Sequence, residues 1–216
     1  MKLTIWAIIC SFKLVTSSWP SLNVSENQDD ICDKNGPVVC NCSEEFNVIC
    51  RGLNLTHFSD WPLPDDTNAV DFSRNVATQF RKSSSWPISI TIINLSRNKI
   101  ATIQKEAFGH FADLQSLDLS YNALQKVDQD MFANLTNLNN LDLSHNQIHV
   151  LASNWISEQN NLIRLNLAFN YLGDEAWTSD TLAALNWLEY LDLTNCSFGI
   201  LPIDVFHNNT RLRELR

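Results

Sequence analysis

The stretch LQSLDLSYNAL at residues 114–124 decides the fold of this chain. Its pattern is L-x-x-L-x-L-x-x-N-x-L, where x is a variable residue, and it recurs as LNNLDLSHNQI at 138–148 and LIRLNLAFNYL at 162–172. An isoleucine-rich version, ITIINLSRNKI, occupies residues 90–100. The asparagines Asn98, Asn122, Asn146 and Asn170 therefore follow one another in steps of 24 residues. This pattern and period predict a solenoid, in which each unit buries its apolar face only against the next unit.

Weaker copies of the pattern extend the repeat in both directions. Such units run their strands in the same direction, because the chain returns along the outer side of the coil after each strand. We therefore predict an α/β repeat, a horseshoe-shaped solenoid with a parallel β-sheet on its concave side and a mostly irregular or short-helical convex side. The weaker copies place these residues at repeat positions: Val70, Phe72, Asn75, Ala77 and Phe80, and then Leu188, Leu191, Leu193, Cys196 and Phe198.

One unit is longer than its neighbours, because 26 residues separate Asn170 from Cys196. Acidic residues open this segment, and leucines and alanines follow at helical spacing. Acids favour the first turn of a helix, where the backbone dipole is positive. The sequence therefore predicts a short helix from about Glu175 to Asn186.

The sequence divides into four parts. Residues 1–18 begin with Met1-Lys2, continue with the apolar run 3–12 and end on small residues, as a secretory signal peptide does. Residues 19–31 are polar and predict a flexible leader. Residues 32–66 hold four cysteines and predict a disulfide-bonded cap that covers the edge of the first repeat. Residues 67–216 form about six repeats, the last of them incomplete.

The four cysteines of the predicted cap are Cys32, Cys40, Cys42 and Cys50, and their spacing alone leaves all three pairings open. A Cys40-Asn41-Cys42 sequence just before such repeats resembles the N-terminal cap of the secreted and cell-surface leucine-rich repeat proteins of animals. The resemblance extends from Cys32 to Leu215. It implies the pairs Cys32–Cys42 and Cys40–Cys50, and roles in adhesion, in receptor ectodomains of the Toll type or in immune recognition.

Seven N-x-Ser/Thr sequons agree with a secreted glycoprotein. Some of them also arise from ordinary repeat sequence, so we expect only some to carry glycan. The candidates are Asn23, Asn41, Asn54, Asn94, Asn134, Asn195 and Asn208.

The repeated asparagines predict a structural ladder. A buried amide pairs the backbone groups of adjacent turns, which would otherwise cost ~1 to 3 kcal/mol each. Cys196 takes the sixth position and is left over once the cap cysteines are paired. We interpret it as a buried member of the ladder, with a reactive or intermolecular thiol as the alternative. The ladder comprises Asn75, Asn98, Asn122, Asn146, Asn170 and Cys196.

Two columns of variable residues are expected on the concave face. Acids and amides in the central column are common filler in such repeats, whereas adjacent exposed rings are costly to hydrate and are enriched at binding hot spots. The residues that we expect to bind a partner are Arg97, Tyr121, His145, Phe169, Asp118, Asp142 and Asn166. The full columns are Asp71, Asn94, Asp118, Asp142, Asn166 and Asp192, followed by Arg74, Arg97, Tyr121, His145, Phe169 and Asn195.

Catalysis and cofactor binding find no support in the sequence. It contains no Gly-x-Ser-x-Gly, no phosphate-binding glycine loop and no His-Glu-x-x-His. His145 and His149 lie four residues apart, but on a strand and its turn, which disfavours a zinc site. We expect no enzyme, no cofactor and no metal. The net charge of -9 disfavours nucleic acid as a partner.

The sequence predicts an extracellular protein-binding module that uses its concave face. The expected partner is an extracellular protein, or a second copy of this chain. The alternative is a glycosylated matrix spacer without a single tight partner. We expect the protein to be secreted or to lie on the outer side of the plasma membrane, with no membrane-spanning segment in this chain. No cysteine cap follows Leu212, so we expect the natural chain to continue or a partner to cover this strand edge.

Overall fold

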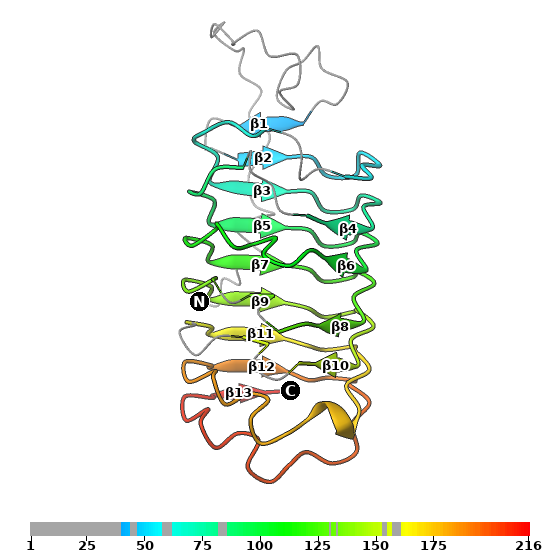
Figure 1. Ribbon diagram of the computed structural model, residues 1–216, viewed down its shortest axis with the longest axis vertical. Helices are drawn as coiled ribbons and strands as arrows, with labels where there is room; N and C mark the ends of the chain where they lie inside the picture. The colour runs from blue at the N-terminus through cyan, green and yellow to red at the C-terminus, as the bar shows by residue number, and fades with distance from the viewer. Residues whose placement is uncertain are drawn as a thin grey trace, which may run out of the picture.

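The computed structural model describes residues 40–43, 47–57, 62–81, 86–129, 131–132, 134–152, 155–156 and 161–216. Within these residues, short strands lie one above another as rungs of a column, and irregular segments connect each rung to the next (Figure 1). The predicted signal peptide (1–18), the leader (19–31) and Cys32 lie outside the described residues, as does the sequon at Asn23.

A nine-stranded sheet forms one side of the solenoid. All neighbouring strands pair in parallel except β1 and β2 of the cap, which are antiparallel. The register follows the repeat, so that Leu117 lies opposite Leu141. The predicted parallel sheet is therefore confirmed. In spatial order the strands are β1 (Asn41–Ser43), β2 (Asn47–Ile49), β3 (Ala69–Asp71), β5 (Ile92–Asn94), β7 (Ser116–Asp118), β9 (Asn140–Asp142), β11 (Arg164–Asn166), β12 (Tyr190–Asp192) and β13 (Glu214–Leu215).

The apolar residues of the repeat form one continuous core behind this sheet. Side chains alternate along a strand, so the middle residue of each three-residue strand points inward, as does the leucine two positions later. Each such side chain contributes about 1.5 to 3 kcal/mol when it is fully buried. The inward residues include Val70, Ile93, Leu117, Leu141, Leu165 and Leu191, with Leu95, Leu119, Leu143, Leu167 and Leu193.

The convex side is more regular than the sequence predicts. Four two-residue strands lie there as a second column (Figure 1), and they pair in parallel as β4 with β6 and β8 with β10. Repeats of equal length keep successive backbones within hydrogen-bonding distance on this side too, which the prediction of a mostly irregular or short-helical surface did not anticipate. The strands are β4 (Gln79–Phe80), β6 (Thr102–Ile103), β8 (Lys126–Val127) and β10 (Val150–Leu151).

Aromatic rings fill the space between the two columns. Phe108 lies between Phe80 and Phe132, with ring centroids 4.9 and 6.1 Å away. Trp86, which comes from the turn after the first repeat, is buried and stacks on Phe72 at 5.4 Å. The degenerate first repeat therefore keeps a packed core although it lacks most of the leucines.

The predicted helix from Glu175 to Asn186 is wrong. A single 3-10 turn, η1 (Asp174–Ala176), forms there, and non-helical turns follow. Thr178 and Thr181 divert the backbone, because the Thr181 hydroxyl accepts the hydrogen bond of the Thr178 N–H at 2.8 Å. The carbonyl of Thr181 accepts a bond from the Trp155 indole of the preceding repeat, at 3.0 Å, instead of a helical N–H.

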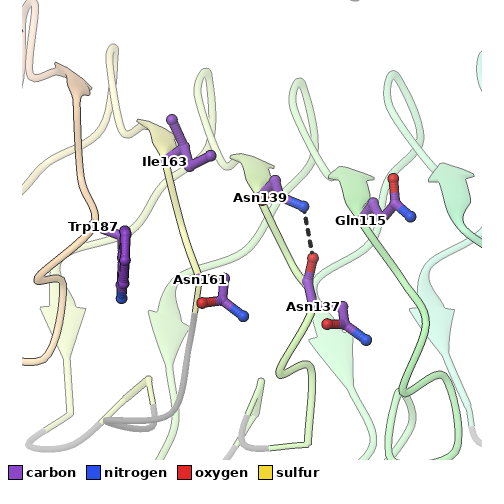
Figure 2. Close-up of a pocket in the computed structure, with 6 residues that line it drawn as sticks. All are labelled: Gln115, Asn137, Asn139, Asn161, Ile163 and Trp187. Carbon is purple, nitrogen blue, oxygen red and sulfur yellow. Dashed lines mark hydrogen bonds between the residues drawn. The ribbon is translucent and has the colours of Figure 1, made fainter.

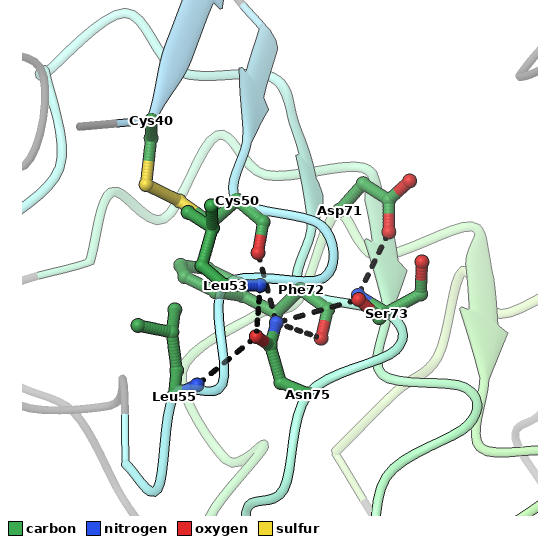
Figure 3. Close-up of a disulfide and its surroundings, with 8 residues drawn as sticks. All are labelled: Cys40, Cys50, Leu53, Leu55, Asp71, Phe72, Ser73 and Asn75. Atoms are coloured by element: carbon green, nitrogen blue, oxygen red, sulfur yellow. Dashed lines mark hydrogen bonds between the residues drawn. A yellow bond between two sulfur atoms is a disulfide. The ribbon is translucent and has the colours of Figure 1, made fainter. Parts of the chain in front are cut away.

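A disulfide between Cys40 and Cys50 anchors the cap, and this is one of the two pairs that the resemblance implies. The cap is tied to the first repeat by Asn75 (Figure 3). Its Nδ2 donates to the carbonyl of Cys50 at 2.8 Å, and its Oδ1 accepts bonds from the N–H groups of Leu53 and Leu55. Cys42 is also disulfide-bonded, and its expected partner Cys32 is outside the described residues.

Candidate functional site

The asparagine ladder fixes the end of each strand in place. Nδ2 of Asn122 donates to the carbonyls of Leu95 and Leu119, both at 3.0 Å, and its Oδ1 accepts the N–H of Ile100 at 2.9 Å. One amide therefore joins two repeats. The corresponding bonds are made by Asn75, Asn98, Asn146 and Asn170.

Cys196 occupies the sixth ladder position. Its thiol is 2% exposed and donates to the carbonyl of Leu167 at 3.1 Å. Burial raises the pKa of this thiol to about 11. A buried, protonated thiol of this kind is a weak nucleophile. This geometry fits a structural member of the ladder.

The acid and amide column of the sheet supports the backbone rather than facing freely outward. Oδ1 of Asp118 accepts a hydrogen bond from the N–H of Ser120, two residues later, at 2.9 Å. Asp71 and Asn94 are buried, each 9% exposed, so the expectation that the whole column is exposed is wrong at these two positions. The same backbone bond is made by Asp71, Asn94, Asp142, Asn166 and Asp192.

Charge in the middle of this column is energetically costly. Burial raises the pKa of Asp118 to about 6, and the negative charge of Asp142 on the neighbouring strand adds to this effect. Burial also raises the pKa of Asp142, whose second oxygen accepts a hydrogen bond from Asn166 at 3.1 Å. A cationic group placed against these two carboxylates would favour their charged form.

The residue that follows each of these bonds adopts a left-handed backbone conformation. The φ angles of the six residues in this second column lie between 53° and 58°. Bulky side chains seldom adopt this conformation, because their Cβ crowds the backbone. The ladder and the acid column impose it at every repeat, and one side chain per repeat is thereby set at the same edge of the sheet. The six residues are Arg74, Arg97, Tyr121, His145, Phe169 and Asn195.

Four of these side chains form a continuous stack, which we call the ring stack: Arg97, Tyr121, His145 and Phe169. The Arg97 guanidinium lies 4.1 Å from the centre of the Tyr121 ring. Tyr121 and His145 lie 4.0 Å apart and 10° from parallel, and His145 and Phe169 lie 4.3 Å apart and 8° from parallel. Parallel strands are spaced about 4.8 Å apart, which is close to the stacking distance of rings. The sequence predicts that these residues are neighbours, and the structure adds their face-to-face packing.

The ring stack presents its edges to solvent. Tyr121 is 38% exposed and Phe169 is 43% exposed. Each ring pair contributes roughly 0.5 to 1.5 kcal/mol beyond its burial, and Arg97 over Tyr121 contributes about 0.5 to 1 kcal/mol. These contacts hold the rings in one arrangement before any partner arrives. The result is a fixed aromatic ridge beside a row of carboxylates.

A second feature lies at the opposite ends of the strands, and sequence reasoning missed it. A solvent-open cavity of about 260 Å³ lies beside the residues that precede β7, β9, β11 and β12 (Figure 2). The only signal in the sequence is that amides recur next to the first leucine of each repeat, which would have been dismissed as filler. Its lining comprises Gln115, Asn137, Asn139, Asn161, Ile163 and Trp187.

The sequons differ in accessibility. Asn94 is buried, and its Oδ1 is bonded to both the N–H and the hydroxyl of Ser96. Asn208 is partly buried, and its Nδ2 donates to the carbonyl of Ala183. Asn41, Asn54, Asn134 and Asn195 are exposed.

The described residues include no group of three or more His, Cys, Asp or Glu side chains that would hold a metal ion. A search of the same part of the chain for a long apolar helix that would cross a membrane found none.

Comparisons with known proteins identify the repeat. A family model described as leucine rich repeat matches residues 88–148 and 114–172, and a second leucine rich repeat model matches 187–209. The crystal structure of a TLR13–ssRNA13 complex superposes with a TM-score of 0.69 at 25% identity over 82% of this chain. Human 5T4 (Wnt-activated inhibitory factor 1, trophoblast glycoprotein) superposes with a TM-score of 0.66 at 26% identity.

The extent of these matches differs. The aligned region covers 25% of the TLR13 chain and 68% of the 5T4 chain, so this chain spans about a quarter of the length of the former. A search of curated proteins gave no match.

Proposed function

Because the chain belongs to the leucine-rich repeat proteins, we propose that it binds an extracellular protein through the concave sheet, with the ring stack at the centre of the contact. The observation that supports this proposal is the exposed stack of Tyr121, His145 and Phe169. The function is binding, and the protein acts in the secreted form or on the outer side of the plasma membrane.

The ring stack suits a protein partner for two reasons. Its rings are already ordered, so binding loses little side-chain entropy, which otherwise costs about 0.5 to 1.5 kcal/mol for each immobilised side chain. The exposed edges combine apolar carbon with the Tyr121 hydroxyl and the His145 ring nitrogens, and such amphipathic rings are enriched at hot spots. The stack is built on strand ends that the asparagine ladder holds, so the surface is rigid.

The charge next to the stack favours a partner surface that carries Lys or Arg. Asp118, Asp142 and Asp192 are partly exposed beside the rings. A basic side chain placed there would offset the repulsion between Asp118 and Asp142 and would lie near ring edges and carboxylates together. The related TLR13 structure contains a single-stranded RNA. We propose a protein for this chain, because the phosphates of a nucleic acid would meet this row of acids and a net charge of -9.

The test compares the secreted wild-type chain with a Tyr121→Asn/Phe169→Asn double variant. Asparagine tolerates the left-handed conformation, as Asn195 shows in the same column, so the fold is kept while both rings are removed. Wild-type chain is first applied to an array of extracellular protein domains, and dissociation constants are then measured for the partners found. We expect saturable binding that the double variant weakens at least tenfold, since hot-spot residues each contribute about 2 kcal/mol or more.

The matched control is Ile203→Asn, because Ile203 is 98% exposed and lies in the turns between β12 and β13. This variant should bind like the wild type. Equal binding by wild type and double variant would refute the proposal. The absence of any saturable partner, together with tolerance of the triple replacement of Tyr121, His145 and Phe169, would favour the glycosylated spacer. Binding only to an RNA oligonucleotide in a parallel titration would also contradict a protein partner.

A further inference from the structure

We propose that the cavity on the opposite edge of the sheet, which we call the amide groove, binds a neutral carbohydrate. The groove runs along the residues that precede β7, β9, β11 and β12, whereas the ring stack follows the same set of strands. It has a volume of about 260 Å³, and Figure 2 shows its side chains in a row that ends at Trp187. The two surfaces are therefore separate.

The amide groups of the groove have a fixed orientation. Nδ2 of Asn137 donates to the carbonyl of Ala112 at 3.0 Å, and Nδ2 of Asn161 donates to the carbonyl of Thr136 at 2.8 Å. A carbonyl accepts only from the nitrogen side of an amide, so these bonds determine which end of each side chain is oxygen. Figure 2 shows the two amides in the same orientation. Asn139 follows the same rule, because its Nδ2 donates to the carbonyl of Asn137 at 2.8 Å.

Because the nitrogens serve the chain itself, the groove offers a ligand mainly the amide oxygens. Three fixed acceptors in a row, from Asn137, Asn139 and Asn161, select a ligand that donates several hydrogen bonds. Each buried donor that meets such an acceptor avoids a desolvation cost of roughly 1 to 3 kcal/mol. A set of vicinal hydroxyl groups meets this requirement.

Trp187 gives the groove an apolar wall. Its indole is 46% exposed, and the Arg211 guanidinium lies 3.7 Å from the ring centre, which holds the indole on one face. The ring also lines the cavity at the end of the amide row. An aromatic face packs well against the C–H face of a pyranose ring, whose axial hydrogens meet the negative π-cloud. Ile163 extends the apolar surface.

The charge of the ligand follows from what the lining omits. None of the six lining side chains carries a charge, so neither a phosphate nor an ammonium group would find a counter-ion there, and transferring either from water would be unfavourable. A neutral ligand with many hydroxyl donors and an apolar face remains, and this is the chemistry of an uncharged sugar. The sugar may be supplied by another molecule or by a glycan of this chain, since the exposed sequon at Asn134 lies three residues before Asn137.

The test measures saturation-transfer NMR and titrations of the intact secreted chain with N,N′-diacetylchitobiose, mannose, galactose and the charged control N-acetylneuraminic acid. Four proteins are compared: wild type, Trp187→Ala, Tyr171→Ala and Asn134→Gln. Tyr171 is 62% exposed and lies outside the groove lining, so its variant controls for loss of an exposed ring. Circular dichroism confirms that each variant is folded.

We expect wild type to bind at least one neutral sugar and Trp187→Ala to bind it at least tenfold more weakly, with Tyr171→Ala unchanged. If the glycan on Asn134 fills the groove, wild type will bind no added sugar and Asn134→Gln will bind it; both outcomes support the proposal. No binding by either wild type or Asn134→Gln, equal binding by Trp187→Ala, or preference for the charged sugar would overturn it. Trp187→Ala should keep any protein partner of the ring stack, so this result is independent of the proposed function.

Discussion

Asp118 and Asp142 lie opposite each other on the parallel strands β7 and β9, and the charge of Asp142 adds to the burial that raises the pKa of Asp118 to about 6. The unfolded chain would titrate Asp118 near 3.8. Between about pH 4 and pH 6 the folded chain therefore holds a proton that the unfolded chain has lost. Linkage then requires that the contribution of Asp118 to stability is greatest at low pH and decreases as the pH rises through this range.

The variant Asp118→Asn should accordingly be more stable than wild type at pH 7.5. An asparagine keeps the oxygen that accepts from Ser120, and the chain itself uses Asn94 and Asn166 in this column. A shift of about two pKa units corresponds to ~3 kcal/mol, which contact of the sheet face with solvent reduces, so we expect a gain of about 1 to 3 kcal/mol. Denaturant unfolding at pH 7.5 and at pH 4 measures it, and the gain should shrink at pH 4.

Asp192→Asn is the matched control for this prediction. Partial burial tends to raise the pKa of Asp192, but hydrogen bonds from Thr194 outweigh this effect and the net pKa is lowered. Its charge therefore stabilises the fold at neutral pH, and this contribution is lost as the pH falls through the folded pKa. The control should lower stability at pH 7.5. A gain in both variants would mean that general charge reduction, and not the Asp118–Asp142 pair, causes the effect.

Removing one rung of the ladder should be costly. Asn122→Ala leaves the Leu95 carbonyl and the Ile100 N–H without the amide that joins them across repeats. Orphaned buried groups cost about 1 to 3 kcal/mol each, so we expect a loss of roughly 3 kcal/mol in urea unfolding. Gln125→Ala, at an exposed position nearby, should change stability by less than about 0.5 kcal/mol. Similar losses in both variants would argue against the ladder.

The thiol of Cys196 should be unreactive in the folded protein. It is buried, and its pKa is raised to about 11, so roughly one molecule in a thousand carries a thiolate at pH 8. Incubation with iodoacetamide at pH 8, followed by mass spectrometry, should show no label on Cys196 until a denaturant is added. Rapid labelling of the native protein would instead support the reactive thiol that the sequence left open.

Replacing this cysteine by asparagine should restore the sixth rung. Asn170 accepts a hydrogen bond from Ile148, and an amide oxygen at position 196 would be offered to Leu172 in the same way. The sequon at Asn195 is preserved, because Ser197 is unchanged. We expect Cys196→Asn to raise the free energy of unfolding by about 1 kcal/mol. A loss of stability would show that the longer repeat between Asn170 and Cys196 distorts the ladder at this point.

The ring stack should add little to folding. Phe169→Asn removes an exposed ring and places a residue that accepts a left-handed backbone, so the lost stacking and the relieved strain partly cancel. We expect a change within about 1 kcal/mol by thermal unfolding. Leu165→Ala, in the core of the same repeat, should cost about 2 to 5 kcal/mol. A large loss for Phe169→Asn would indicate that the rings serve stability.

The amino-acid sequence determined the repeat, the strand positions, the parallel register and the ladder. Each of these depends on a local pattern of 24 residues, and strict alternation along a short strand leaves a single register that buries the leucines. The same reasoning placed Arg97, Tyr121, His145 and Phe169 in one column. The predicted helix failed because helical spacing between Glu175 and Asn186 did not reveal the competing bonds of Thr178 and Thr181.

The tertiary structure alone decided how residues 24 or more apart in sequence meet. Stacking of Tyr121 on His145 requires both the spacing of the strands and the left-handed backbone, and burial of Asp71 and Asn94 depends on their neighbours across the sheet. The amide groove exists only because turns of successive repeats align Asn137, Asn161 and Trp187 along one edge. A periodic sequence specifies the solenoid, whereas the chemistry of its surfaces arises from contacts between repeats.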